Sequence, residues 1–145
     1  MEIRRDWYKA DLITRLTLKK NDSHIHMETT LKNPEKTHKN IRSGYSLCIT
    51  GGWIDVPGGR GLRENTLGDW MVGYNKGWAF GLHSNYYKEV KGGTTWTEQF
   101  VRNTIKPEGK KSYEAWLQVV PSGSSAPVID YNMQLNDTAF GTVKG

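Results

Sequence analysis

Residues 11–33, DLITRLTLKKNDSHIHMETTLKN, decide the fold class because apolar and polar side chains alternate on either side of a polar turn. Before the turn Leu12, Leu16 and Leu18 share one face, and after it Met27 and Leu31 do the same. A period of two is typical of a half-buried strand, and the run Asn-Asp-Ser between the two segments favours a turn. The sequence therefore predicts a long antiparallel hairpin with one face on a core and the other in water.

The same alternation recurs along the rest of the chain. It predicts strands at residues 45–50, 70–74, 78–83, 94–105 and 112–120, and a last strand at 128–135. In the 112–120 strand, Tyr113, Ala115, Leu117 and Val119 are expected to point inward. Roughly eight or nine short strands between turn signals are typical of a sandwich or barrel. We therefore predict an all-β antiparallel β-sandwich with little helix, forming a single domain over residues 1–145, either as a whole protein or as a module of a longer one.

Tryptophan and tyrosine dominate the aromatic residues, with six Trp and seven Tyr against three Phe. Such rings combine a flat apolar face with a polar group, which suits sugar rings, nucleic-acid bases and protein interfaces. The net charge of +5 is compatible with an acidic polysaccharide, a nucleic acid or an anionic surface. No run approaches the ~18 apolar residues of a membrane span, and the first residues lack a signal-peptide pattern. The sequence does not decide the cellular compartment; the protein is expected to be secreted or periplasmic if the chain belongs to a longer enzyme.

Metal and thiol chemistry have little support in the sequence. His24, His26 and Glu28 occupy alternate positions of one strand, so they share a face and are weak candidates for a divalent metal or an acid–base pair. A solvated strand face is the favoured interpretation of that pattern. Cys48 is the only cysteine, which excludes a disulfide within the chain, and we expect it to be buried and inert. No cofactor is predicted.

Aromatic and arginine side chains gather around a glycine-rich segment at residues 57–69, a long loop of the kind that is often functional. Aromatic faces can stack on pyranose rings, and arginine can donate two hydrogen bonds to hydroxyls or to a uronate carboxylate. The same groups could stack bases and hold phosphates, so a single-stranded nucleic acid is a rival ligand. The candidate ligand-binding residues are Trp53, Arg60, Arg63, Trp70, Tyr74, Trp78, His83, Tyr86, Tyr87 and Trp96.

Three segments, NDSHIHMETTLKNPEK, SGYSLCITGGW and PEGKKSYEAWLQVVPSG, together with a Gly-Trp-Ala-Phe-Gly hairpin, resemble the galactose-mutarotase-like β-supersandwich domains of carbohydrate-active proteins. The resemblance spans about two-thirds of the chain and rests on loose patterns. It implies a fold of that type and a carbohydrate-related role. Catalytic members place a His and a Glu across a concave sheet, and His83 and Glu98 match that pair by residue type and order. The chain has about half the usual length of such a domain, which puts catalysis in doubt more than binding.

The sequence thus predicts a carbohydrate-binding or carbohydrate-processing domain that uses an aromatic-lined face. The alternative is a structural or assembly module whose exposed aromatic residues pack on another chain or domain, including a second copy. Any enzymatic activity would be that of a sugar epimerase, a lyase or a glycoside hydrolase accessory domain. A single-stranded nucleic-acid binder is the weakest of the three classes.

Overall fold

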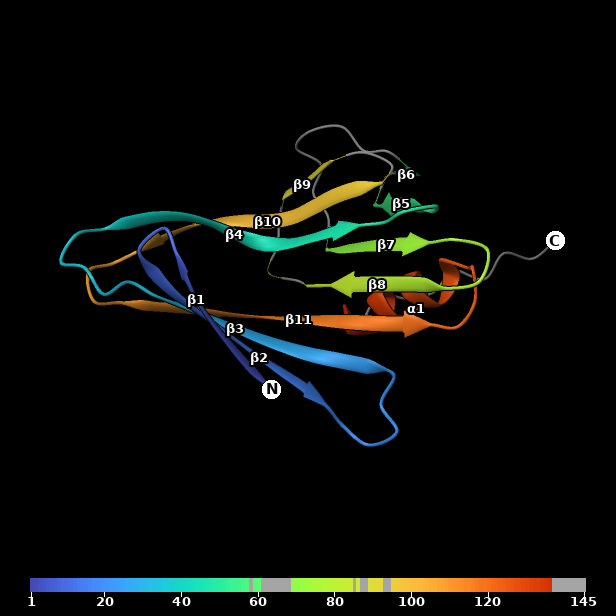
Figure 1. The fold of residues 1–145 in the computed structure, drawn as a ribbon, viewed down its shortest axis with the longest axis horizontal. Coiled ribbons are helices and arrows are strands. Elements are labelled where there is room, and N and C mark those ends of the chain that lie inside the picture. The colour runs from blue at the N-terminus through green and yellow to red at the C-terminus, as the bar shows by residue number, and fades with distance from the viewer. Residues whose placement is uncertain (58, 61–68, 85, 87–88, 93–94, 137–145) are drawn as a thin grey trace.

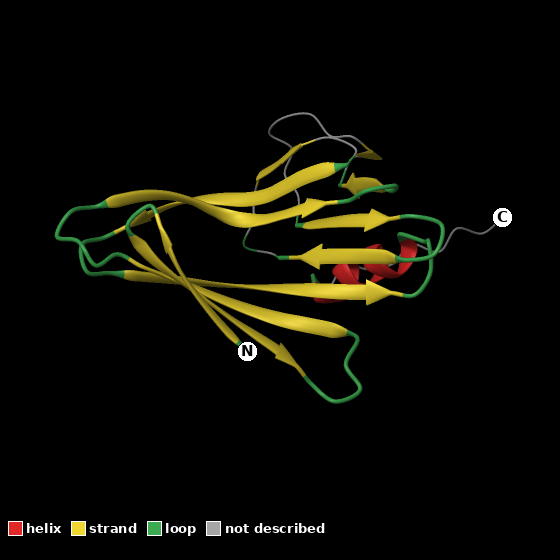
Figure 2. Ribbon diagram, in the orientation of Figure 1, coloured by secondary structure: helices red, strands yellow, loops and turns green. Residues whose placement is uncertain are grey.

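The computed structural model describes residues 1–57, 59–60, 69–84, 86, 89–92 and 95–136. They form two antiparallel sheets and one helix (Figures 1 and 2). The larger sheet has the strand order β1-β2-β3-β11-β8-β7-β5-β6, and the smaller has the order β4-β10-β9. The bounds are β1 (Glu2–Trp7), β2 (Ala10–Leu18), β3 (His24–Lys32), β4 (Lys39–Cys48), β5 (Trp53–Val56), β6 (Gly59–Arg60), β7 (Trp70–Tyr74), β8 (Ala79–His83), β9 (Glu89–Gly92), β10 (Trp96–Ile105), β11 (Lys110–Val120) and α1 (Ala126–Leu135).

The all-β antiparallel prediction is confirmed, and the hairpin at residues 11–33 forms as β2 and β3. Leu12 faces Leu31 and Leu16 faces Met27 across the two strands, so the apolar positions share one face of the sheet. Leu31 is fully buried in the core. The predicted hairpin of β7 and β8 also forms, and places Met71 opposite Leu82. Period-two patterning therefore fixes both strand identity and strand face in these segments.

The main core lies between the two sheets. Leu31, Ile54 and Met71 from the larger sheet are completely buried there. Gly73 of β7 shows how closely the sheets approach, because a Cβ at this position would lie 1.9 Å from Cδ1 of Ile49, just after β4. Only glycine leaves room for that isoleucine at the centre of the sandwich.

The strand predicted at residues 128–135 is wrong, because this segment belongs to the helix α1. Pro127 stands in the first turn, where its fixed φ suits a helix and its missing N–H costs no hydrogen bond. Val128, Tyr131 and Asn132 then follow at helical spacing, and Val128 is fully buried against the larger sheet. The isoleucine, valine and tyrosine of this segment favour a strand locally, but packing on the sheet decides the outcome.

The helix covers the outer face of β7, β8 and β11, which the sequence pattern treats as solvated (Figure 1). This explains a second error, in the inward face of β11. Tyr113 and Ala115 are buried as predicted, but Val119 is 47% exposed while Gln118 and Val120 are buried. At that end of the strand the helix buries the face opposite to the one that the sequence pattern favours.

Three smaller differences concern strand extent and the thiol. Four short strands, β1, β5, β6 and β9, have no counterpart among the predicted strands, and β6 lies in the segment predicted as a long loop. β4 begins at Lys39, six residues before the predicted start at Tyr45. Cys48 is exposed, so the expectation of a buried thiol is wrong. No helix in the described part of the chain is long and apolar enough to cross a bilayer.

Candidate functional site

Three of the candidate ligand-binding residues line one open hollow at the end of the larger sheet. Trp53 of β5 lies directly opposite Tyr74 of β7, and Trp78 follows at the turn before β8. The hollow has a volume of about 650 Å³. We call it the Trp53 hollow; its lining residues are Gly51, Trp53, Tyr74, Asn75, Lys76, Gly77, Trp78 and Gly123.

A tight turn at residues 75–78 lines the Trp53 hollow, and the side chain of Asn75 stabilises it. Oδ1 of Asn75 accepts hydrogen bonds from the backbone N–H of Gly77 at 2.8 Å and of Trp78 at 3.2 Å. The loop after β11 presses on this turn, since a Cβ at Gly123 would lie 2.2 Å from the carbonyl oxygen of Asn75. Two chain segments thus fix the position of the indole of Trp78, whose ring also packs on Phe80 with centroids 4.8 Å apart.

Polar groups stand beside the aromatic rings of the hollow. The hydroxyl of Tyr74 donates a hydrogen bond of 2.6 Å to Oδ2 of Asp55, which lies on the same face of β5 as Trp53. Trp53 is 48% exposed, so about half of the residue is accessible to solvent at the hollow. Lys76 is exposed at the tip of the turn. The hollow therefore offers aromatic surface, an amide and an ammonium group, and the carboxylate of Asp55 lies next to it through the hydrogen bond from Tyr74.

Other candidate residues contribute to packing or lie outside the description. Tyr86 stacks on Tyr113 with centroids 4.9 Å apart and donates a hydrogen bond to Oδ1 of Asn103, so it belongs to the core. Trp70 is partly buried and packs against the cluster under α1. The backbones of Arg60 and Trp96 lie in β6 and β10, but their side chains are outside the described residues, as are Arg63 and Tyr87 altogether.

His83 lies beneath α1 and is fully buried. Its Nε2 is 3.2 Å from Oε1 of Gln118, whose amide NH₂ donates to the carbonyl oxygen of Pro127, so Nε2 carries the proton in the neutral ring. Its Nδ1 has no hydrogen-bond partner, and Tyr131 of α1 meets the ring edge-on at 5.0 Å between centroids. Burial lowers the pKa of His83 from 6.5 to about 4, against the raising effect of its polar contacts with Gln118 and Asn132.

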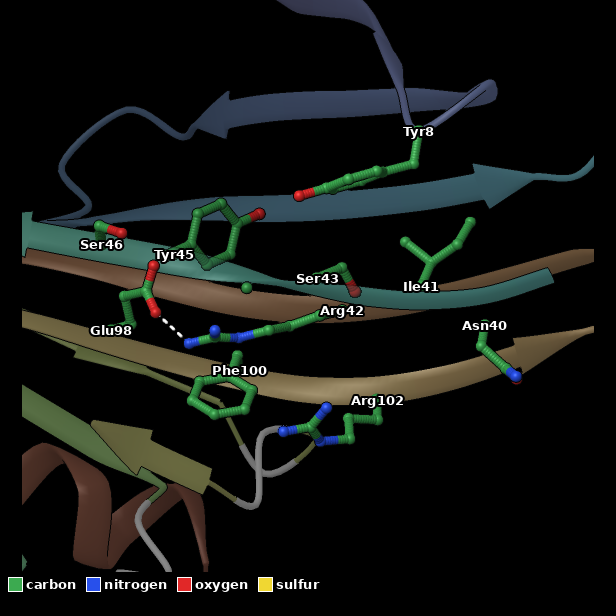
Figure 3. Close-up of a pocket in the computed structure, with 11 residues that line it drawn as sticks. Tyr8, Asn40, Ile41, Arg42, Ser43, Tyr45, Ser46, Glu98, Phe100 and Arg102 are labelled. Carbon is green, nitrogen blue, oxygen red and sulfur yellow. Dashed lines mark hydrogen bonds and ion pairs between the residues drawn. The ribbon is translucent and has the colours of Figure 1, made fainter. Parts of the chain in front are cut away.

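Glu98 lies in a different place, on the outer face of the smaller sheet (Figure 3). It forms an ion pair with Arg42 of β4, and the guanidinium of Arg42 stacks 3.7 Å from the ring centre of Phe100. These side chains border a second groove of about 470 Å³. His83 and Glu98 stand on different sheets, each on the face turned away from the core, so the structure does not bring them together as a reacting pair.

The strand face that carries His24, His26 and Glu28 is partly covered. His24 stacks on Tyr131 of α1 with centroids 3.7 Å apart, and His26 stacks on Trp116 at 5.4 Å. Nε2 of His26 is 3.4 Å from a carboxylate oxygen of Glu114 on the neighbouring strand, while Glu28 is exposed. Within the described ranges, no group of three or more His, Cys, Asp or Glu residues is placed to hold a metal ion.

Several residues of the two sites have no signal in the sequence. Asn75 and Lys76 line the Trp53 hollow from the turn before β8, and Asp55 lies beside it because β5 pairs with β7. Arg42 meets Glu98 only because β4 pairs with β10. Alternation of apolar and polar residues around Arg42 could have predicted that its side chain lies on an outer face. It could not have predicted that Arg42 meets Glu98, because the two residues are more than fifty positions apart in the sequence.

No family model and no curated protein matches this chain, but several solved structures share its fold. The Slr1438 protein of Synechocystis gives a TM-score of 0.57 at 10% identity and covers 83% of this chain and 61% of its own. A protein from the human microbiome assigned as a kojibiose phosphorylase gives 0.60 at 11% identity, over 91% of this chain and 19% of its own. A Klebsiella pneumoniae protein assigned as an aldose 1-epimerase gives 0.53 at 9% identity, over 94% and 53%.

These likenesses support the galactose-mutarotase-like β-sandwich fold that the sequence motifs resemble. At 9–11% identity they show the fold alone. The chain also spans only part of each of these proteins, 61%, 19% and 53% of their lengths. Function must therefore be argued from the sites of this chain.

Proposed function

We propose that this chain binds carbohydrate in the Trp53 hollow. The observation that carries the proposal is the half-exposed indole of Trp53 beside Tyr74 and Trp78, with the carboxylate of Asp55 next to them. A pyranose ring has one face of C–H groups and an edge of hydroxyls, so it is recognised by an aromatic face together with a few polar groups. The hollow provides both kinds of group on one rigid sheet.

Each side chain has a distinct role in this proposal. Trp53 supplies the stacking surface, and Asp55 accepts hydrogen bonds from sugar hydroxyls with an oxygen that is already oriented by Tyr74. The turn at Asn75 holds Trp78 at the rim, so little order has to be created when the ligand binds. Lys76 at the turn tip favours a ligand that carries carboxylates, as does the net charge of +5. An acidic polysaccharide is therefore the preferred class of ligand.

A calorimetric titration against a panel of neutral and acidic oligosaccharides tests this proposal. A fully buried tryptophan side chain removes roughly 200 Å² from water, and at 48% exposure Trp53 still has about 100 Å² in contact with solvent. If a sugar covers half of this exposed area, the burial contributes about 1.3 kcal/mol to binding. We therefore expect Trp53→Ala to weaken binding about tenfold. Val119→Ala is the matched control, because Val119 on β11 is equally exposed but does not line the hollow.

Absence of binding to every oligosaccharide would contradict the proposal, as would equal binding by the wild type and Trp53→Ala. Single-stranded nucleic acid belongs in the same titration, because aromatic residues and lysine also suit bases and phosphates. If the nucleic acid binds and the oligosaccharides do not, the hollow has the rival ligand. Sedimentation of the unliganded chain tests the assembly alternative, in which Trp53 packs on another chain and the protein is not a monomer.

A further inference from the structure

The two sheets differ greatly in width, and the difference leaves apolar surface uncovered. The larger sheet has eight strands and the smaller has three within the described residues. Ile3 of β1 and Leu18 of β2 lie on the face of the larger sheet that is directed toward the core. They are nevertheless 48% and 62% exposed. Figure 1 shows β2 and β3 running away from β4 at their turn end. Exposed apolar residues on a core-directed sheet face favour an interaction surface.

An unpaired strand edge lies beside this surface. Among the described strands, β4 pairs only with β10, so the other edge of its ten residues is open. The groove of about 470 Å³ runs along that edge and is overhung by Tyr8 from the turn between β1 and β2 (Figure 3). Its lining includes side chains from both faces of β4, Tyr45 from the inner face and Arg42 from the outer one. A groove that is lined in this way leaves room for one additional strand to pair with the open edge of β4.

The inner side of the groove connects β4 with the exposed end of the larger sheet. The hydroxyl of Tyr45 is 2.6 Å from Oγ1 of Thr29, which is itself 3.0 Å from Oγ1 of Thr14 on β2. Ile3 lies opposite Thr14 in the β1–β2 ladder. A strand placed against β4 would therefore direct alternate side chains toward Ile3 and its apolar neighbours on β2.

The outer side of the groove is cationic. Arg42 and Arg102 are directly opposite each other on β4 and β10, and Glu98 is the carboxylate that pairs with Arg42. A carboxylate on an added strand beside Arg42 would be attracted by these two guanidinium groups. The sequence of β4, KNIRSGYSLC, contains a lysine and an arginine but no acidic residue, so two copies of β4 are poorly matched to each other.

We propose that the open edge of β4 receives one extended strand from a partner protein, in which apolar residues alternate with aspartate or glutamate. Main-chain hydrogen bonds to β4 would supply much of the affinity, as in other cases of strand addition to a sheet. The apolar residues cover Ile3 and Leu18 on the inner side, and the carboxylates meet Arg42 and Arg102 on the outer side. This inference is independent of carbohydrate binding in the Trp53 hollow.

The probe is a synthetic peptide of alternating valine and glutamate with the length of β4, measured by fluorescence anisotropy. We expect it to bind, a lysine-for-glutamate peptide to bind more weakly, and a peptide N-methylated along one edge not to bind. Arg102→Gln should weaken binding up to about fivefold, the range of an exposed ion pair, and Ile3→Ser about tenfold through lost apolar burial. Lys20→Gln, at the exposed turn between β2 and β3, is the charge-matched control and should have no effect.

Hydrogen exchange locates the contact. Peptide binding should slow amide exchange in β4 and in β1, while Trp53→Ala should leave peptide affinity unchanged. The inference is overturned if the peptide does not bind, if the N-methylated peptide binds equally well, or if protection falls outside β4. A dimer in sedimentation with β4 already protected in the absence of peptide would also overturn it, in favour of a second copy of this chain.

Discussion

The buried His83 predicts a loss of stability in mild acid. Its pKa is lowered from 6.5 to about 4 in the folded chain, because the charged ring would lie in a fully buried site. Between these two values the unfolded chain takes up a proton that the folded chain does not, so stability is fully present above pH 6.5 and falls as the pH falls toward 4. A difference of about 2.5 pKa units at 1.36 kcal/mol each corresponds to about 3 kcal/mol.

The perturbation that isolates this effect is His83→Gln. Glutamine does not titrate, and its amide can still donate to Oε1 of Gln118 as Nε2 of the histidine does. The variant loses the edge contact with Tyr131, so its stability near neutral pH should be lower than that of the wild type. The readout is therefore the pH dependence of stability and not its value at one pH.

Urea unfolding, followed by tryptophan fluorescence from about pH 7.5 to about pH 4, measures this dependence. We expect wild-type stability to fall by about 3 kcal/mol more than that of His83→Gln over this range. His38→Gln is the control, because His38 is exposed in the loop before β4 and its removal should leave the wild-type slope unchanged. Parallel curves for the wild type and His83→Gln would refute the assignment of acid sensitivity to this buried ring.

Three further predictions concern the sandwich and the Trp53 hollow. Gly73→Ala should destabilise the fold by about 1–3 kcal/mol in thermal or urea unfolding, because its Cβ would collide with Ile49; an unchanged stability would contradict the close sheet contact. Tyr74→Phe removes the hydrogen bond to Asp55 and should cost about 1–2 kcal/mol of stability and weaken oligosaccharide binding, whereas unaltered binding would exclude a role for the oriented carboxylate. Asn75→Ala removes the acceptor of two turn hydrogen bonds and should cost about 1 kcal/mol with weaker binding, while Asn75→Asp, which keeps the acceptor, should restore both.

The strands that could be predicted are those in which local pattern and tertiary environment agree. β2 and β3 have one buried face and a polar turn between them, so alternation identified them. β7 and β8 are buried on both faces, yet the polar turn between them still marked them as a hairpin. The segment of α1 contains valine, isoleucine and tyrosine, which favour strands in isolation. Its helical state depends on Pro127 in the first turn and on the contact of Val128 with Gly81, where a Cβ would lie 2.5 Å from the valine. That contact involves a residue nearly fifty positions away and has no local signal.

The candidate site was predictable only in part, because the count of aromatic residues does not separate surface rings from core rings. Trp53, Tyr74 and Trp78 do gather in one hollow, near the hairpin where the sequence pattern located the site. Tyr86 and Trp70 have the same chemistry, but sheet packing and α1 occupy them. The rings of the hollow lie at the end of the larger sheet. Their position depends on the order of the strands in the sheet, and alternation along one strand does not predict that order.

The most direct test of carbohydrate binding in the Trp53 hollow is an NMR titration of the tryptophan indole N–H signals, with the Trp53 signal assigned from its absence in Trp53→Phe. We expect an acidic oligosaccharide to shift the Trp53 signal progressively and to saturation. The signal of Trp116, which stacks on His26 away from the hollow, should not move. A Trp53 signal that stays in place while an oligosaccharide binds would contradict carbohydrate binding in the Trp53 hollow.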